Sequence, residues 1–439
     1  MNAAFNMTNF YSKIFCTFLA LTMLSACQSL RYSFINHDIN KEINKSTVFR
    51  NQFTGFTLYD PESKNYLCNH NDQLYFTPAS NTKILTTYAC LEHLGDSIAS
   101  YSFAESGDSI FLKPLADPTF LHPDFSSQKA LKQLSNKNVF IDFPDNKLAK
   151  YGSGWAWDDF LYSFQPERSW FPIYGNVVRI FNKSDSLNIS PIFFRDFVHI
   201  STGTRPGNLI YRSEFANIFS AWIEGDTSTY EREIPFIYNT EILVELLTDT
   251  THSTVLVKAN IQPATDTLYS QATLQVLATM MLPSDNFIAE HLLVHCALMN
   301  GQTDIDNYRN ALLKEWNTFL PDPINWKDGS GLSRYNLITP RSLVSILDQI
   351  YQNESWETIE SLFPIGGVSG TLKNNYVGNE PYVFAKTGTL SNNHNLSGFL
   401  KTKSGKTLIF SLMNNNYVNQ TSEVKQEMEK LLLRIHEAY

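Results

Sequence analysis

The sequence has few cysteines, a single long apolar run and fewer basic than acidic side chains. Five cysteines in 439 residues cannot form a dense disulfide framework, so a hydrophobic core has to stabilise the fold. The 34 basic and 43 acidic side chains give a formal net charge of −9, without any Lys/Arg-rich run. Because a general nucleic-acid binder needs a basic face to collect phosphates, we expect no nucleic acid among the partners.

Metal-ligand spacings are also scarce. No cysteine and histidine pattern has the spacing of a zinc site, and Glu290 precedes both His291 and His295. A zinc-peptidase motif places its glutamate between the two histidines, so metal binding at this pair is disfavoured. We expect neither a metal nor another cofactor.

The long apolar run lies near the N-terminus, where residues 14–24 follow Lys13 and precede Ser25-Ala26-Cys27. The run is too short to span a bilayer comfortably but suits the hydrophobic part of a signal peptide. Small residues directly before a cysteine resemble a bacterial lipobox. This pattern predicts a lipoprotein signal over residues 1–26, a lipid on the sulfur of Cys27, and a polar tether over residues 27–46. The alternative is an ordinary secretory signal with an incidental cysteine.

Three cysteines remain in the predicted mature chain, because Cys16 leaves with the signal and Cys27 carries the lipid. Cys68, Cys90 and Cys296 each lie in an apolar context typical of a buried strand or helix. We therefore expect buried free thiols. One bridge could form among the three, and the sequence does not assign its partners.

The length of 439 residues suits two or three domains. Residues 96–266 contain short β-rich runs between polar turns, many aromatic residues and few long helical patterns. The flanking segments, 47–95 and 267–439, combine strands near the chain ends with helical patterns between them. We expect an α+β domain whose sheet is built from both ends of the chain and which the β-rich segment interrupts.

A serine and a lysine stand where a helix is predicted to begin. Pro78 resists continuation of a helix from its N-terminal side, and apolar residues recur at helical spacing as far as Leu94. Ser80 is expected in the first turn, with Lys83 one turn further on the same face, where its amine can take the hydroxyl proton. A bare Ser-x-x-Lys is more often an ordinary surface pair, so a nucleophile needs support from further motifs.

Two further motifs follow. Ser284-Asp-Asn286 is predicted on a loop between two helices, where its side chains can point into a cleft or cap a helix. Lys386-Thr-Gly388 is predicted inside a strand, where glycine is unfavourable unless something such as a bound substrate approaches the backbone closely. Ser-x-x-Lys, Ser-Asp-Asn and Lys-Thr-Gly, in this order, form the three-part signature of penicillin-binding proteins and class A β-lactamases.

The segments around these motifs carry a closer resemblance. They are Thr77-Pro-Ala-Ser-Asn-Thr-Lys83, Ala116-Asp-Pro-Thr-Phe120, Gly154-Trp-Ala-Trp-Asp-Asp159, Leu282-Pro-Ser-Asp-Asn-Phe-Ile-Ala-Glu-His291, Asp328-Gly-Ser-Gly-Leu-Ser-Arg334, Gly370-Thr-Leu372 and Ala385-Lys-Thr-Gly-Thr-Leu390. With them the chain resembles the D-alanyl-D-alanine carboxypeptidase/endopeptidases of the penicillin-binding protein 4 type, which are serine peptidases of the class C low-molecular-mass group. The resemblance implies a penicillin-binding-protein/β-lactamase-like transpeptidase domain, an antiparallel sheet flanked by helices, with extra domains inserted between the first two motifs.

The resemblance also implies acyl transfer from peptidoglycan peptides that end in D-Ala-D-Ala. Ser80 would attack the penultimate D-Ala carbonyl and hold an acyl-enzyme, with Lys83 as its base. Ser284 would relay the proton to the leaving amine, and Asn286 would orient Lys83 and the substrate amide. β-Lactam antibiotics would acylate the same serine.

The strand motif is implied to bind the substrate's terminal carboxylate through Lys386, Thr387 and Thr389, with Gly388 as a further substrate-binding residue. The backbone N–H groups of Ser80 and Thr389 would form the oxyanion hole.

Two further contacts are implied for the substrate's side chain. Asp159 matches a family position that holds the free amine of the diaminopimelate side chain, and an ordinary loop aspartate is the alternative. Arg334 matches a second substrate contact, and a cap or structural ion pair is the alternative.

These expectations describe a serine DD-peptidase on the periplasmic side of the bacterial cell envelope, held to a membrane by a lipid anchor. A β-lactamase shares the three motifs but normally lacks so large an insertion. A catalytically idle binder of cell-wall peptides would not require all of the catalytic side chains. An esterase using Ser-x-x-Lys would not need Lys386. The sequence leaves open whether terminal D-Ala removal or cross-link cleavage dominates.

Overall fold

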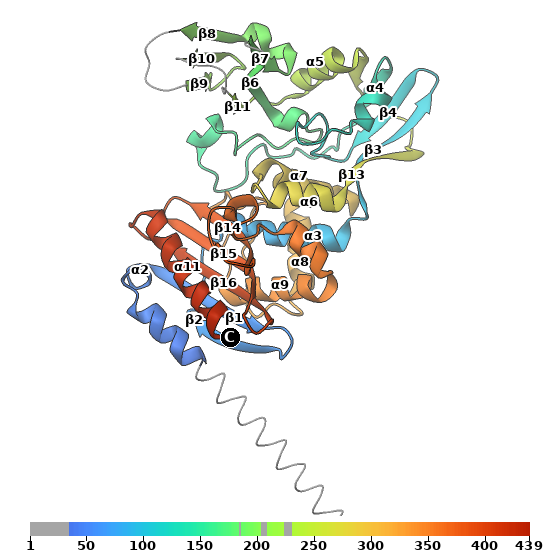
Figure 1. Cartoon of the computed structure of the whole chain (residues 1–439). Coiled ribbons are helices and arrows are strands. Elements are labelled where there is room, and N and C mark those ends of the chain that lie inside the picture. Colours follow the sequence, from blue (N-terminus) through green and yellow to red (C-terminus); the bar gives the residue numbers. More distant parts are fainter. Residues whose placement is uncertain (1–34, 184–185, 203–208, 224–230) are drawn as a thin grey trace, which may run out of the picture.

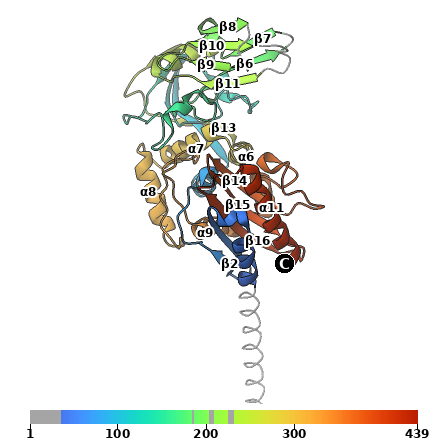
Figure 2. The same ribbon diagram turned by 90° about the vertical axis from the view of Figure 1, so that its left-hand side faces the viewer.

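The computed structural model describes residues 35–183, 186–202, 209–223 and 231–439. The predicted signal over residues 1–26, Cys27 and the first part of the predicted tether lie outside the described residues. The described chain forms two bodies stacked end to end (Figure 1). We call them the main domain, residues 35–95 and 273–439, and the inserted domain, residues 96–272. The first described residues and the C-terminus lie at the end of the molecule opposite the inserted domain (Figure 2).

One antiparallel sheet organises the main domain. Its strands have the order β14-β15-β16-β1-β2, so both ends of the chain contribute to it, as the sequence predicts. β1 pairs with β16 from Phe53↔Asn415 to Tyr59↔Ile409, which joins the N-terminal strand to the last one. The bounds are Phe53–Asp60 for β1, Asn65–His70 for β2, Val383–Leu390 for β14, Asn393–Lys401 for β15 and Thr407–Asn415 for β16.

Helices cover both faces of this sheet, which confirms the predicted α+β fold. On one face lie α3 Lys83–His93, α6 Thr273–Met281, α7 Asn286–Met299, α8 Ile305–Trp316, α9 Pro340–Asn353 and α10 Trp356–Leu362. On the other lie α2 Thr47–Arg50 and α11 Thr421–Ala438. Each face buries its own apolar core. Within the described part of the chain, every helix is too short or too polar to cross a membrane.

The segment before α2 differs from the predicted tether. Residues 35–45 are helical, and Ile35, Ile39 and Ile43 are buried in the same core as α11. Arg434 of α11 also forms ion pairs with carboxylates of this helix. The prediction of a polar tether is therefore wrong from residue 35 onward. The isoleucines recur every fourth residue, which is the spacing of one helix face, and polar neighbours mask this pattern in the composition.

Three small sheets make up most of the described part of the inserted domain. Their orders are β12-β5-β4-β3-β13, β11-β6-β7 and β8-β10-β9. The first contains β3 Ser97–Ser106, β4 Ser109–Pro114, β5 Asn138–Ile141, β12 Thr254–Val257 and β13 Asp266–Ala272. The others contain β6 Val177–Lys183, β7 Ser186–Ser190, β8 Val198–Thr202, β9 Leu209–Arg212, β10 Phe219–Ile223 and β11 Glu231–Pro235. Among the described residues of this domain, the α-helices α4 Lys129–Leu134 and α5 Thr240–Thr251 accompany the sheets.

The insertion ends later than residue 266, where the sequence pattern places its boundary. β13 pairs with β3 beginning at Asp266↔Phe103, so residues 266–272 complete the inserted sheet before α6 begins. The connection between β5 and β6, residues 142–176, returns from the inserted domain to the main domain. On its way it places Trp155 Nε1 2.8 Å from Asp328 Oδ2 of the main domain. The connection therefore contacts the main domain directly.

Candidate active site

Ser80 and Lys83 lie where η1, a 3₁₀ turn over Ala79–Thr82, runs into α3. Ser80 thus precedes the α-helix instead of lying in its first turn, because α3 begins at Lys83. Ala79 has a left-handed φ of 50°, which is a strained conformation for a residue with a side chain. The turn brings Lys83 Nζ to 3.1 Å from Ser80 Oγ, so amine and hydroxyl are within hydrogen-bond distance.

Neutral acceptors surround the ammonium group of Lys83. Its Nζ donates to Asn286 Oδ1 at 2.6 Å and to the carbonyl oxygen of Ser330 at 2.8 Å. The side chain is fully buried, and among the described residues no carboxylate forms an ion pair with it. Burial lowers the pKa of Lys83 to about 8, although more distant carboxylates oppose the shift. About a tenth of this lysine is therefore neutral at pH 7, far more than for an ordinary lysine.

The carbonyl group of Ser330 comes from a tight loop that the sequence reading does not assign to the site. Asp328 shapes this loop, because its carboxylate accepts hydrogen bonds from the N–H groups of Gly331 and Ser333 at 2.9 and 2.6 Å. Gly331 has a left-handed φ of 87°, and a Cβ there would lie 1.9 Å from the Ala79 carbonyl oxygen. The loop can therefore approach η1 only with glycine at this position. The Asp-Gly-Ser-Gly pattern of residues 328–331 is the sequence feature that could have predicted this tight loop.

Ser284-Asp-Asn286 combines a cap with two site residues. Asp285 caps α7, since its Oδ1 accepts the Ile288 N–H at 2.7 Å. Ser284 stands before the helix with a left-handed φ of 70°, and Asn286 is the first helical residue. Asn286 also donates from Nδ2 to the Phe164 carbonyl oxygen at 2.8 Å. Its amide therefore links Lys83 to the inserted domain.

Lys386 is the second buried lysine of the site. Its Nζ donates to Ser284 Oγ at 2.8 Å and to the Thr387 carbonyl oxygen at 3.0 Å. Burial and, secondarily, the charge of Lys83 hold the pKa of Lys386 well below its usual range. The Thr387 hydroxyl faces another way and donates to Thr371 Oγ1 at 2.8 Å. Lys386 and Ser284 thus form a second amine–hydroxyl pair beside the first.

At Gly388 the protein's own chain approaches the strand closely, and the predicted contact of this residue with substrate stays a prediction. A Cβ at Gly388 would lie 2.4 Å from the Pro78 carbonyl oxygen and 2.6 Å from Asn81 Oδ1. Asn81 Nδ2 in turn donates to the Lys386 carbonyl oxygen at 3.1 Å. The glycine lets β14 lie directly against η1, which brings the strand motif beside Ser80.

Thr389 has a buried partner that the sequence reading misses. His394 lies opposite Thr389 across the β14–β15 hairpin, with its Nδ1 2.7 Å from the threonine Oγ1. Burial and the charge of Lys425 lower the pKa of His394 to about 3, so its ring is neutral at neutral pH. The pair fixes the Thr389 hydroxyl at the edge of the cleft. Only strand pairing brings the two residues together.

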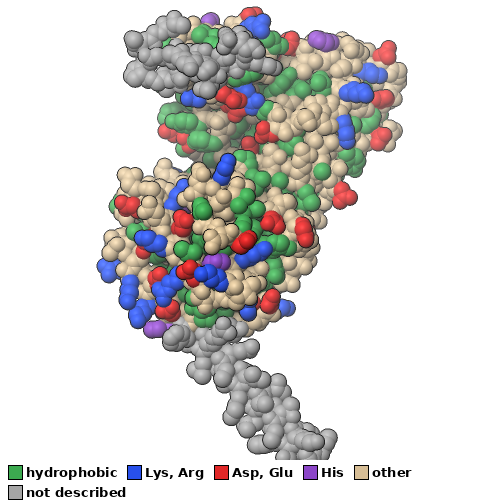
Figure 3. All heavy atoms as spheres, in the orientation of Figure 1, with side chains coloured by type: hydrophobic (Ala, Val, Ile, Leu, Met, Phe, Trp, Pro, Cys, Tyr) green, Lys and Arg blue, Asp and Glu red, His purple; other side chains and the backbone are tan. Residues whose placement is uncertain are grey.

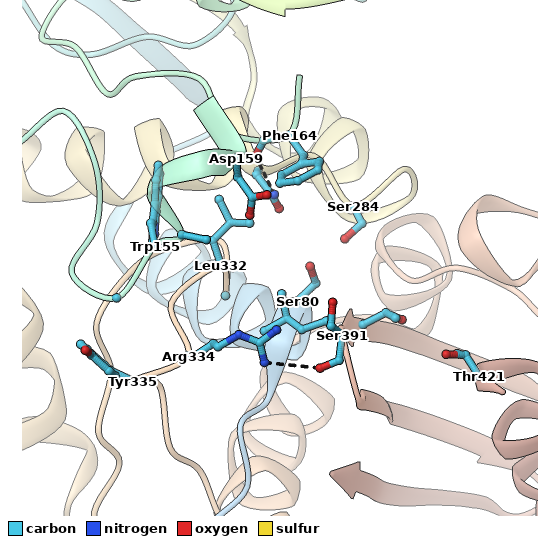
Figure 4. Close-up of a pocket in the computed structure, with 16 residues that line it drawn as sticks. Ser80, Trp155, Asp159, Phe164, Ser284, Leu332, Arg334, Tyr335, Ser391 and Thr421 are labelled. Atoms are coloured by element: carbon cyan, nitrogen blue, oxygen red, sulfur yellow. Dashed lines mark hydrogen bonds between the residues drawn. The ribbon is translucent and has the colours of Figure 1, made fainter. Parts of the chain in front are cut away.

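A cleft of about 760 Å³ opens in front of these groups. Figure 4 shows Ser80 near its centre, with Asp159 and Phe164 on the side of the inserted domain and Arg334 on the opposite wall. The molecular surface is hollowed between the two domains on the left of Figure 3, and acidic and basic side chains are interspersed on that face. Six of the predicted site residues line the cleft, namely Ser80, Asp159, Ser284, Asn286, Arg334 and Thr389. Lys83, Lys386, Thr387 and Gly388 are not part of its wall.

Asp159 and Arg334 face the cleft without an ion pair between them among the described residues. Partial burial and the neighbouring Asp158 raise the pKa of Asp159, while Arg334 opposes this shift. Arg334 is exposed and donates to the Ser391 carbonyl oxygen at 3.4 Å. Both side chains therefore remain available to a ligand.

His291 and His295 of α7 are buried and form hydrogen bonds within the protein. His291 accepts the Ser169 N–H at 3.1 Å through Nε2, and its Nδ1 lies 2.8 Å from the Phe287 carbonyl oxygen. His295 Nδ1 lies 2.6 Å from the Leu115 carbonyl oxygen. In residues 35–439, apart from the three undescribed gaps, no group of His, Cys, Asp and Glu side chains has a geometry that could hold a metal ion.

Solved structures share this fold. Penicillin binding protein 4 (dacB) from Haemophilus influenzae superimposes with a TM-score of 0.72 over 91% of this chain and 99% of that one, at 19% identity. The same protein in complex with a β-lactam superimposes with a TM-score of 0.65 at 18% identity. At sequence identities this low, the superpositions establish that the fold is the same and nothing further.

Curated relatives match over shorter segments. The D-alanyl-D-alanine carboxypeptidase DacB of Haemophilus influenzae is 37% identical over 109 residues, which cover 24% of this chain and 23% of the relative. The penicillin-sensitive carboxypeptidase A of Dictyostelium discoideum is 28% identical over 173 residues, 36% of this chain and 33% of the relative. The sequence profile of the D-Ala-D-Ala carboxypeptidase 3 (S13) family matches residues 35–183 and 241–437, which is most of the sequence. The chain therefore belongs to the D-Ala-D-Ala carboxypeptidase 3 (S13) family.

Proposed function

We propose that this protein is a serine DD-peptidase of peptidoglycan. It removes the terminal D-Ala from D-Ala-D-Ala peptides, cleaves D-Ala cross-links, or does both, through an acyl-enzyme on Ser80. The observation that carries the proposal is the contact of Lys83 Nζ with Ser80 Oγ at 3.1 Å in a buried site without a counter-ion among the described residues. A neutral Lys83 takes the hydroxyl proton as the serine attacks the carbonyl carbon.

The second amine–hydroxyl pair, Lys386 and Ser284, acts on two groups of the substrate. Ser284 protonates the leaving amine, and Lys386 binds the terminal carboxylate. Ser284 lies between Lys386 and the open cleft and passes a proton to the departing D-Ala amine. The terminal carboxylate supplies the counter-ion that the buried Lys386 lacks among the described residues. Its binding stabilises the charged form of Lys386, and that charge keeps the pKa of nearby Lys83 low. The N–H groups of Ser80 and Thr389 are the proposed oxyanion donors.

The cleft wall sets the choice of peptide. We assign Asp159 to a free amine on the third residue of the stem peptide, because its carboxylate faces the cleft without an ion-pair partner in the described residues. Arg334 lies on the opposite wall and suits a carboxylate of the same residue. A diamino acid with a second acid group fits both contacts.

The protein works on the periplasmic side of the bacterial cell envelope, held to a membrane by a lipid on Cys27. The helix over residues 35–45 packs on the main domain at the end opposite the inserted domain (Figure 2). An anchor that precedes this helix leaves the inserted domain pointing away from the lipid surface.

The first test is the intact mass of the protein after brief exposure to benzylpenicillin. We expect a stable adduct of one penicillin on the parent chain and none on Ser80→Ala, because the antibiotic acylates the nucleophile. An unmodified chain with intact antibiotic would support an idle binder instead. An unmodified chain with hydrolysed antibiotic would identify a β-lactamase.

A peptide assay then tests the substrate. An Nα-acetylated L-Lys-D-Ala-D-Ala peptide, whose side-chain amine stays free for Asp159, should release D-Ala. Its C-terminal amide should be hydrolysed at least about tenfold more slowly, because Lys386 loses its counter-ion. Equal rates on the acid and the amide would contradict the role of Lys386 and favour a general esterase or amidase.

A further inference from the structure

Two thiols that the proposed mechanism does not use lie next to each other in the core of the main domain. Cys90 is in α3 and Cys296 is in α7, and their Sγ atoms are 3.5 Å apart. Both side chains are fully buried. The residues are 206 positions apart in the sequence, so the whole inserted domain lies between them.

The third described cysteine is not a competing partner. Cys68 lies in β2 and belongs to the core on the other face of the sheet, whereas Cys90 and Cys296 share the core beneath the helices. Its sulfur is 3.5 Å from Asn40 Nδ2 of the 35–45 helix. Among the described residues, therefore, only one pair of thiols can meet without rearrangement of the sheet.

We propose that Cys90 and Cys296 are a modification site, joined by a disulfide bond in the mature protein. The proposal rests on the envelope location given under the proposed function, where disulfides form and persist. The two thiols lose two protons and two electrons, and one S–S bond forms. A protein disulfide of a thiol oxidase, or oxidised glutathione in vitro, accepts them and becomes two thiols. Rotation of the two side chains has to close the remaining distance between the sulfur atoms.

Burial dictates when the bond forms. A disulfide-carrying oxidant must reach a thiolate, and in the folded chain neither sulfur is exposed to solvent. Burial and the neighbouring thiol also raise the pKa of Cys90, which disfavours the reactive thiolate. Oxidation therefore takes place during folding, before α3 and α7 close over the pair. The finished bond is then shielded from reductants by the same core.

The position of the bond connects it to the site. α3 begins at Lys83 and α7 begins at Asn286, and these two residues contact each other at 2.6 Å. The bond ties the same two helices together in their C-terminal halves. It thus fixes the distance between the two helices at the end opposite the Lys83–Asn286 contact. In the unfolded chain it closes a loop that includes the inserted domain, which lowers the conformational entropy of the unfolded state.

Thiol mapping of the full protein tests the proposal without relying on catalysis. Protein from the bacterial envelope is denatured in N-ethylmaleimide without reductant, digested and analysed by mass spectrometry. We expect a Cys90–Cys296 linked peptide in most chains, with Cys68 alkylated as the internal control. Alkylated Cys90 and Cys296, or a bridge to Cys68, would overturn the proposal. The benzylpenicillin adduct, measured on the same sample, reports separately on the proposed function.

Matched variants give a second readout. Parent protein refolded with a thiol reductant should melt about 5 °C or more below protein refolded with oxidised glutathione. Cys90→Ala and Cys296→Ala should lose this difference, whereas Cys68→Ala should keep it. A difference that persists in Cys90→Ala would place the redox-sensitive bond elsewhere. If both core variants fail to fold, the peptide map of the parent protein decides alone.

Discussion

Two buried lysines govern the chemistry at the scale of single residues. Lys83 and Lys386 are both fully buried, and each donates to neutral oxygen atoms. Burying an ammonium group without a counter-ion favours its neutral form, so burial lowers the pKa and leaves part of the amine free to accept a proton. One feature, the absence of a paired carboxylate among the described residues, thus suits both the proposed base, Lys83, and the proposed carboxylate site, Lys386.

The pH dependence of acylation follows from Lys83. Only its neutral amine accepts the serine proton, and protonation proceeds as pH falls through a pKa of about 8. The second-order rate of acylation by benzylpenicillin should therefore fall about tenfold for each pH unit below that value and level off above it. Stopped-flow kinetics or quenched mass spectrometry can measure this rate, with Ser80→Ala as the blank.

The same profile tests His394. Its pKa of about 3 keeps the ring neutral across this range, so we expect no second step near the usual histidine value of about 6.5. A profile that is flat below pH 8, or that bends only near the histidine value, is incompatible with Lys83 as the base.

At the scale of elements, the site depends on how closely β14 approaches η1. The strand carries Lys386 and Thr389, and the turn carries Ser80. Gly388 permits the contact because a side chain there would overlap the Pro78 carbonyl oxygen. A backbone oxygen cannot rotate away as a flexible side chain can, so the strand and the turn would have to separate.

Gly388→Ala should therefore lower both stability and activity. We expect a loss of about 2 kcal/mol in unfolding free energy and at least about a tenfold slower acylation, because Ser80 moves away from the strand. Thermal unfolding and the benzylpenicillin assay measure the two effects.

Gly95→Ala is the matched control, since nothing lies within 4 Å of a Cβ at that position. It should change unfolding free energy by no more than about 0.5 to 1 kcal/mol and leave acylation intact. Equal behaviour of the two alanine variants would refute the packing explanation.

At the scale of the whole molecule, the β5–β6 connection ties the inserted domain to the site. Arg168 of this connection lies 3.6 Å from Glu290 of α7, and both side chains are almost fully buried. Glu290 accepts the Ser330 N–H at 2.7 Å, and the Ser330 carbonyl oxygen accepts from Lys83. A chain of contacts thus runs from the inserted domain to Lys83, the proposed general base.

Arg168→Ala should destabilise the protein, although Arg168 is not one of the residues that line the cleft. The buried Glu290 carboxyl loses its cation, which costs about 3 kcal/mol and lowers Tm by about 5 °C. Acylation should slow as well, because the Ser330 carbonyl is less firmly held.

Lys430→Ala is the control for loss of an ion pair. Lys430 pairs with Glu427 but its side chain is 72% exposed, so its removal should change Tm by no more than about 1 °C. An Arg168→Ala protein as stable as Lys430→Ala would show that the buried pair does not couple the domains.

The sequence alone determined the local features of this protein. The i, i+3 spacing brings Lys83 to Ser80, and Lys386-Thr-Gly388 lies inside β14 as its local pattern predicts, because these signals act over a few residues. The resemblance to the family also rests on short motifs, and both the motifs and their order can be read directly from the sequence. Strands at both chain ends are enough to predict the shared sheet.

Tertiary structure decided which distant groups meet. Strand pairing set His394 against Thr389, and a turn 310 positions upstream explains Gly388 through Pro78. Burial of Ile35 made a helix from the segment predicted as a tether. The pairing of the two core thiols was open for the same reason. The Thr389–His394 pair is five positions apart and depends on the register of one hairpin, whereas the other outcomes depend on packing between segments far apart in the chain. Composition and spacing encode neither.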